Sequence, residues 1–283
     1  MTAAELYEAG RLQAAIDQQI VEVKAAPADS TKRLFLFDLF AFAGELDRAA
    51  RQLDAIATDD IQQQAAIQSY RRLVDAERLR RLVFEGKGRP KFLGDVPAHV
   101  EHRLEAVLHL SKGDLAAASE ALARAAETTP ALRGTLNGET FELLVDCDDL
   151  FGTVVEVVAG GDYFWVPLEQ IESIRFQPPK YPVDLIWRPA SLETPRSHGE
   201  VFMPVLYPGS HTNADDQVRL GRLTDWVAGE VGPVRGVGVH TFLADERDVS
   251  LLEWADVEFE VAHETPPEVE MVDEPTSEPP SAE

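Results

Sequence analysis

The stretch FAGELDRAARQL, residues 42–53, decides the fold, because its pattern occurs in two other parts of the chain. EAGRLQAAIDQQ (residues 8–19) and SKGDLAAASEAL (residues 111–122) also place Leu two residues and Ala five residues after a Gly. The first two glycines are 34 residues apart, and the third follows 69 residues later, about twice that spacing. A period of 34 residues is typical of tetratricopeptide repeats, in which such a Gly lies in the turn between two helices. The pattern therefore predicts stacked helical hairpins.

The residues around the three glycines support helices with one buried face. Leu and Ala recur at helical spacing after each Gly, and RLFLFDLFAFAG (residues 33–44) is apolar on nearly all sides. Asp60 to Phe84 is predicted to form one longer helix, and no third glycine phrase occurs near residue 78, where a regular array would have one. Residues 1–133 are thus predicted to form a tetratricopeptide-like helical module with an interruption.

From about Gly138 the pattern changes to short runs rich in Val, Phe, Tyr and Trp between Gly, Pro and Asp clusters. Such runs are typical of β-strands, and AGGDYF (residues 159–164) and LADERDV (residues 243–249) are predicted hairpin turns. A single short helix is predicted within RLGRLTDWVAGE (residues 219–230). The expected fold class is α+β, with a β-rich, barrel-like or sandwich-like module at 134–262 and a disordered acidic, Pro-rich tail at 263–283.

The charge of the chain is unevenly distributed. The formal net charge is −24, and residues 1–133 hold 18 Lys and Arg against 20 Asp and Glu, whereas residues 134–262 hold 8 against 23. Phosphate groups would be repelled by the second half, so we expect no nucleic-acid ligand there. The sequence contains no apolar run of membrane-spanning length, no signal-peptide pattern and a single cysteine, Cys147. We therefore expect a cytoplasmic protein without a membrane partner.

One cluster of basic residues stands out in the first half, on and after the long predicted helix. It has a net charge of +5 over 21 residues. Two interpretations are open: a solvated helix face that pairs with the acidic second half, or a docking site for an acidic partner. The cluster consists of Arg71, Arg72, Arg78, Arg80, Arg81, Lys87, Arg89 and Lys91, interspersed with Asp75, Glu77 and Glu85.

A second candidate partner surface consists of apolar residues. In tetratricopeptide folds the first helix of each hairpin lines the concave face, where a partner helix can lie in an apolar groove. Phe35, Leu39 and Phe42 are the repeat residues predicted nearest that surface. If the β-rich module covers the array, the same residues are core.

We find no strong catalytic, cofactor or metal motif. FEGKGRP lacks the upstream Gly and the Ser or Thr of a phosphate-binding loop, and His99 and His102 lack a third metal ligand. The best enzyme candidate is VDCDDLFG (residues 145–152), where Asp146 and Asp148 could form an acid/base or metal site with His211 or His240. The competing interpretation is turn chemistry, in which Asp side chains bind the backbone two residues on. We predict no catalytic residue, no metal and no cofactor.

Several segments of the second half resemble a known protein family. CDDLFGTVVEVVAGGDYFWVPLEQIESIRF (residues 147–176), RLGRLTDW (residues 219–226) and RGVGVHTFLADERDVSLLEW (residues 235–254) are similar to the ImpE/TagJ (SciE-type) family of type VI secretion accessory proteins. The resemblance implies a non-enzymatic adaptor that binds the small sheath subunit through a helix near that subunit's N-terminus. Through this subunit it implies a link to the ATPase that disassembles the contracted sheath. The alternatives are a hydrolase built around Asp146, Asp148 and a histidine, and a generic helical-repeat chaperone.

Overall fold

The computed structural model describes residues 1–229 and 231–260. The predicted tail at 263–283 and the last two residues of the predicted β-rich module lie outside the described residues. None of the helices at 1–229 and 231–260 combines the length and the hydropathy of a membrane-spanning segment.

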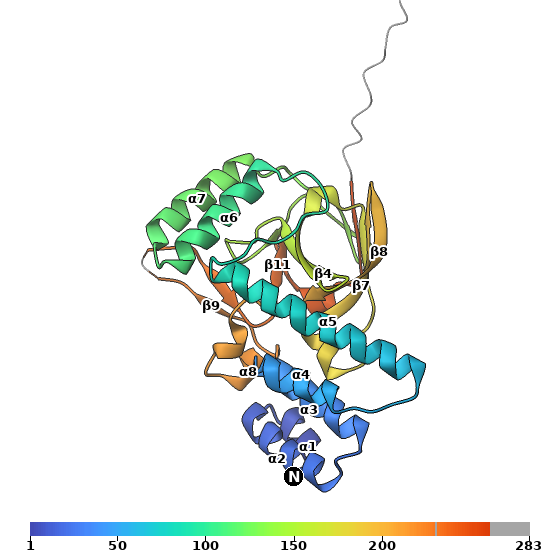
Figure 1. Cartoon of the computed structure of the whole chain (residues 1–283). Helices are drawn as coiled ribbons and strands as arrows, with labels where there is room; N and C mark the ends of the chain where they lie inside the picture. The colour runs from blue at the N-terminus through green and yellow to red at the C-terminus, as the bar shows by residue number, and fades with distance from the viewer. Residues whose placement is uncertain (230, 261–283) are drawn as a thin grey trace, which may run out of the picture.

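Helices fill the first half of the chain, as predicted. Figure 1 shows α5 crossing the middle of the molecule, with α1 to α4 on one side and the sheets on the other. The helices are α1 (Ala3–Glu8), α2 (Leu12–Ala25), α3 (Ser30–Phe42), α4 (Leu46–Asp54), α5 (Ile61–Phe84), α6 (Ala98–Ser111), α7 (Leu115–Thr128) and, in the second half, α8 (Asp216–Arg219).

Each repeated glycine phrase marks the turn of a helical hairpin. Gly10, Gly44 and Gly113 have φ angles of 69°, 72° and 75°, a left-handed conformation that costs Gly little. The residue after each Gly donates its backbone N–H to a carbonyl five residues earlier, at 2.9, 2.9 and 3.0 Å. The hairpins are α1–α2, α3–α4 and α6–α7, so the repeat prediction is confirmed.

The missing phrase is explained by α5, a single helix of 24 residues where the array would otherwise turn. It begins within one residue of the predicted start, where the Asp60 side chain accepts from the Gln62 backbone N–H. It ends at Phe84, two residues before Gly86, which also has a positive φ of 70°. The helix is long because it packs against both the α1–α4 hairpins and the second half.

Antiparallel sheets form the second half, in agreement with the predicted β-rich module. One eight-stranded sheet has the order β2-β1-β13-β6-β7-β8-β4-β5, and β12-β11-β3 and β10-β9 form two smaller sheets. Among the described residues the large sheet ends at β2 and β5, so no closed barrel forms. The strands are β1 (Gly134–Leu136), β2 (Glu139–Phe141), β3 (Leu144–Asp146), β4 (Val154–Ala159), β5 (Asp162–Pro167), β6 (Ser173–Phe176), β7 (Trp187–Thr194), β8 (Ser197–Pro204), β9 (Asp225–Val227), β10 (Arg235–Val237), β11 (Thr241–Ala244), β12 (Arg247–Ser250) and β13 (Asp256–Phe259).

Both predicted hairpin turns are present, but the predicted short helix is misplaced. Gly160 and Gly161 turn β4 into β5 with positive φ, and Asp245 turns β11 into β12 with φ 53°. The short helix α8 precedes residue 220, and residues 225–227 form β9. The helix stops early because Gly221 adopts a positive φ of 67° and ends it.

The two halves share one hydrophobic core. It joins Leu39 and Phe42 of α3 to Trp165, Trp187 and Tyr207 of the second half. A second core lies within the sheets. α7 ends at Thr128 and β1 begins at Gly134, and the first core contains residues from both sides of this change.

The second half also covers the turns of the first two hairpins. Asp216 Oδ2 accepts from Leu12 N at 2.8 Å, and Arg222 donates to the carbonyls of Tyr7 (2.7 Å) and Glu8 (2.8 Å). A Cβ added at Gly44 would overlap the ring of His211. These contacts add hydrogen bonds to backbone groups at the end of α1 and the start of α2, although the Tyr7 carbonyl also accepts from Gly10 N.

Candidate functional site

The strongest cluster of titratable side chains lies between α5 and the sheets. His240 Nδ1 is 2.6 Å from Asp146 Oδ2, and its Nε2 is 3.2 Å from Glu156 Oε2. Arg80 of α5 donates to both carboxylate oxygens of Glu156, at 2.7 and 2.6 Å. Tyr207 Oη donates to the other Asp146 oxygen at 2.6 Å. The structure thus joins Asp146 to His240, one of the two candidate histidines, and adds partners that the sequence did not suggest.

The electrostatics of this cluster favour fixed charges. Burial disfavours charged His240, but the charges and hydrogen bonds of Asp146 and Glu156 outweigh it and raise the His240 pKa to about 9. Burial likewise opposes ionised Glu156, yet Arg80 and His240 lower its pKa to about 2. Both His240 nitrogens face carboxylates, so the ring is a charged donor at neutral pH. A histidine held in this state is a poor general base.

Asp148 does what the turn interpretation predicts. It accepts from Leu150 N, two residues on, at 2.9 Å, and from Gly236 N at 2.8 Å. Arg235 lies 2.8 Å from the same carboxylate. Burial raises the Asp148 pKa and Arg235 opposes the rise. Asp148 therefore fixes the loop before β4 onto β10.

The cluster is closed to substrates. Asp146 and Glu156 side chains are 0% and 1% exposed, and the small cavity beside Glu156 and His240 measures about 10 Å³, room for about one water molecule. His211 lies elsewhere, against Gly44, where burial and nearby arginines lower its pKa to about 4. No group of three or more metal-ligating side chains occurs among residues 1–229 and 231–260. The cluster is a structural lock, meaning that its buried ion pairs and hydrogen bonds hold α5 against the sheets.

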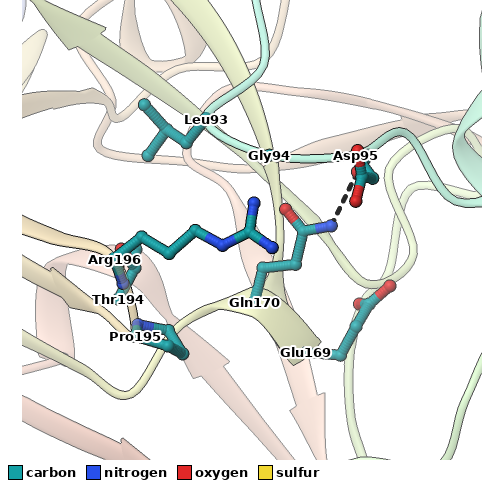
Figure 2. Close-up of a pocket in the computed structure, with 8 residues that line it drawn as sticks. All are labelled: Leu93, Gly94, Asp95, Glu169, Gln170, Thr194, Pro195 and Arg196. Atoms are coloured by element: carbon teal, nitrogen blue, oxygen red, sulfur yellow. Dashed lines mark hydrogen bonds between the residues drawn. The ribbon is translucent and has the colours of Figure 1, made fainter.

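His99 and His102, the two histidines considered as metal ligands, also make contacts within the fold. His99 Nε2 lies 2.6 Å from Glu169 Oε1, and the His99 side chain is buried. His102 lies 3.7 Å from Glu105 of its own helix. Glu169 borders a surface pocket of about 260 Å³, shown in Figure 2, in which Arg196 extends toward Gln170. Asp95 and Glu169 line this pocket with Arg196, so its charges are mixed.

The predicted basic cluster is mostly neutralised by the protein itself. Arg80 is buried against Glu156, as described above, and cannot contact a partner. The other predicted arginines are half-buried or exposed: Arg71 pairs with Asp54 (2.9 Å), Arg78 with Asp47 (2.8 Å) and Asp75 (2.7 Å), and Arg81 with Glu77 (3.2 Å), while Arg72 is exposed. Of these arginines, Arg80 forms an ion pair with the acidic second half, which is the pairing that the first interpretation predicted.

The predicted apolar partner surface is largely covered. Leu39 and Phe42 are 0% and 1% exposed, because the second half packs over them, and Phe35 is half-buried against Tyr7. These residues are therefore part of the core, as expected if the β-rich module covers the helical array.

Sequence reasoning missed a basic groove that is lined by residues of the first two hairpins alone. It measures about 350 Å³ and lies between α2, α3 and α4. The basic residues that line it are Lys24, Arg33, Arg48 and Arg51. They are spread over 28 positions and three helices, so no local charge run signals them.

Comparisons with known proteins agree on one family. The model of the family described as ImpE protein matches residues 138–258. The type VI secretion system accessory component TagJ of Pseudomonas aeruginosa is 32% identical over 261 residues, 92% of each chain. The crystal structure of protein VPA1032 from Vibrio parahaemolyticus has a TM-score of 0.82 at 23% identity and covers 91% of this chain and 97% of its own, which shows the shared fold.

Proposed function

The chain belongs to the ImpE/TagJ family of type VI secretion accessory components, and from this premise we propose that it is a non-enzymatic cytoplasmic adaptor of such a secretion system. The likeness to TagJ carries the proposal, because it spans 92% of both chains and therefore includes both halves. The generic chaperone alternative loses support for the same reason.

We propose that the partner is the small sheath subunit, bound through a helix near its N-terminus, and that the sheath-disassembling ATPase is reached through it. The fold supports an adaptor role, since helical hairpins present grooves that suit a partner helix. The role is modulatory: the protein aids sheath handling or recycling.

The hydrolase alternative has little support in the geometry. Asp146, Glu156 and His240 are almost fully buried, and each is saturated by neighbours that hold its charge in place. A substrate would need a cavity of several hundred Å³, whereas the cavities beside this cluster measure about 10 Å³ at Glu156 and His240 and about 30 Å³ at Arg80 and Tyr207.

The test is calorimetric titration of the full chain with the small sheath subunit from the same bacterium. We expect a 1:1 complex that is lost when the subunit's N-terminal helix is deleted. Lack of binding by the intact subunit at micromolar concentrations would overturn the adaptor proposal.

A further inference from the structure

One deeply buried carboxylic acid lies outside the structural lock. Asp38 is in α3, between the core residues Phe37 and Leu39, and only 6% of it is exposed. Asp is almost never buried to this degree unless a cation or several hydrogen bonds compensate its charge. The acids of the lock have such partners, so the burial of Asp38 needs a different explanation.

The surroundings of Asp38 do not compensate a negative charge. In the part of the chain that the structure describes, its carboxyl group forms no ion pair with Lys, Arg or His and accepts no hydrogen bond. The titratable groups that interact with it electrostatically are Asp184 of the second half, Tyr7 of α1 and Tyr70 of α5, and Tyr181 acts on Tyr70. Each of these groups is either neutral or negative.

Asp184 places a second buried acid on the other side of the contact. It lies in η2 (Pro182–Leu185), a short 3₁₀-helix that contacts α3, and it is 8% exposed. Its Oδ2 accepts from the backbone N–H groups of Lys180 (2.8 Å) and Tyr181 (3.0 Å). Asp184 thus has donors for a negative charge, whereas Asp38 has none.

A proton on Asp38 removes the conflict between the two acids. Two carboxyl groups that meet in a buried interface cannot both ionise at low energy. Burial and the charge of Asp184 raise the pKa of Asp38 well above its ordinary value of 3.8. In the unfolded chain the acid ionises near that ordinary value. The stability supplied by the proton is therefore complete at low pH and is lost as pH rises through the folded pKa.

We propose that Asp38 and Asp184 form a proton-dependent latch between the helical half and the second half. With a proton on Asp38, η2 closes against α3. When Asp38 loses the proton, two buried negative charges repel each other across the contact, and η2 loosens from α3. The latch couples the packing of the two halves to pH through residues that the structural lock does not use.

The first test compares urea unfolding of the full-length wild type and Asp38→Asn from pH 4.5 to pH 7.5. Asn has nearly the shape of the protonated acid and cannot ionise. We expect the unfolding constant of the wild type, divided by that of the variant, to rise with pH by up to about tenfold per unit, because the two proteins differ in one titrating group. A ratio that is constant over this range would overturn the proposal.

The matched control is Asp17→Asn, the same change on an exposed residue of α2. Its ratio is expected to stay within about twofold across the same pH range, because an exposed Asp titrates similarly in the folded and unfolded chain. A rise equal to that of Asp38→Asn would mean that the effect does not come from the buried position.

Hydrogen exchange of the wild type locates the effect without any substitution. After correction for the intrinsic pH dependence of exchange, the amides of residues 35–42 and 183–186 should exchange at least about threefold faster at pH 7.5 than at pH 5, and those of α6 and α7 should not. Asp38→Asn should abolish the difference. Equal protection of α3 and η2 at both pH values would contradict the latch.

Asp184→Asn determines whether the two acids act as a pair. Without the charge of Asp184 the pKa of Asp38 should fall, so the pH midpoint of the exchange transition should move down by about half a unit or more. An unchanged midpoint would mean that Asp38 responds to burial alone, and the paired latch would be wrong.

Discussion

The helical half, α1 to α7, has one face packed against the second half and one face that is open, and arginine is arranged differently on the two. On the covered side, Arg80 meets Glu156 and His240 in a buried network whose charges balance. On the open side, Arg33 and Arg51 have no carboxylate partner in the described chain. The same residue type is a structural lock where its charge is compensated inside the fold and a solvated surface charge where it is not.

Removing the lock should have the largest effect. Arg80→Ala leaves Glu156 buried without its main cation, and we expect the free energy of unfolding to fall by about 3–5 kcal/mol. Arg78→Ala, on the partly exposed side of the same helix, should cost less than about 1 kcal/mol. Urea denaturation followed by tryptophan fluorescence measures both. Similar losses in the free energy of unfolding for the two variants would show that the buried and the partly exposed arginine contribute equally to stability.

The lock should also give the protein a characteristic dependence on alkaline pH. The folded pKa of His240 is raised to about 9 from 6.5, so its contribution is complete below about pH 6.5 and is lost as pH rises through 9. A shift of this size corresponds to roughly 3 kcal/mol. Urea unfolding at pH 6.5 and pH 9.5 measures it, and His240→Gln should remove this part of the pH dependence. A wild type equally stable at both pH values would contradict the charged histidine.

The glycine turns offer a matched pair between a covered and an open site. Gly44→Ala should destabilise by about 2–4 kcal/mol, because a left-handed alanine is strained and its Cβ would overlap His211. Gly113→Ala has the same strain with no atom within 4 Å of the new Cβ, so about 1 kcal/mol is expected. Thermal and urea unfolding of the two variants compare them directly. Equal losses of stability would mean that His211 of the second half does not lie close enough to the Gly44 turn to overlap a new Cβ.

The open face should show the smallest effect on stability. Arg51→Ala removes an exposed side chain without an ion pair, so the free energy of unfolding should stay within about 0.5 kcal/mol of the wild type. The same urea titration checks it. A loss above 1 kcal/mol would mean that Arg51 is part of the packing, as Arg80 is.

Much of the fold could be predicted from local patterns. The three glycine phrases located the hairpin turns, and alternating runs with Gly-Gly and Asp turns located the strands of the second half. The short helix was misplaced, because the pattern around residues 219–230 did not reveal that Gly221 ends the helix rather than continuing it.

The site was predicted less well, and the reason is distance along the chain. Asp146 and His240 were named as possible partners, but Arg80 was grouped with the solvent-facing arginines, because nothing in its neighbourhood reveals that Glu156, 76 residues away, lies against it. The basic groove was missed for a similar reason: Lys24, Arg33 and Arg51 meet only when three helices pack together.

By itself the sequence determined the helical hairpins, the change to strands near residue 134 and the resemblance to one family, because these depend on the order of neighbouring residues. The tertiary structure decided which face of the hairpins the second half covers, and therefore which charges are neutralised and which remain available. Burial and ion pairing depend on segments separated by many residues, and a charge has a defined environment only once those segments have packed.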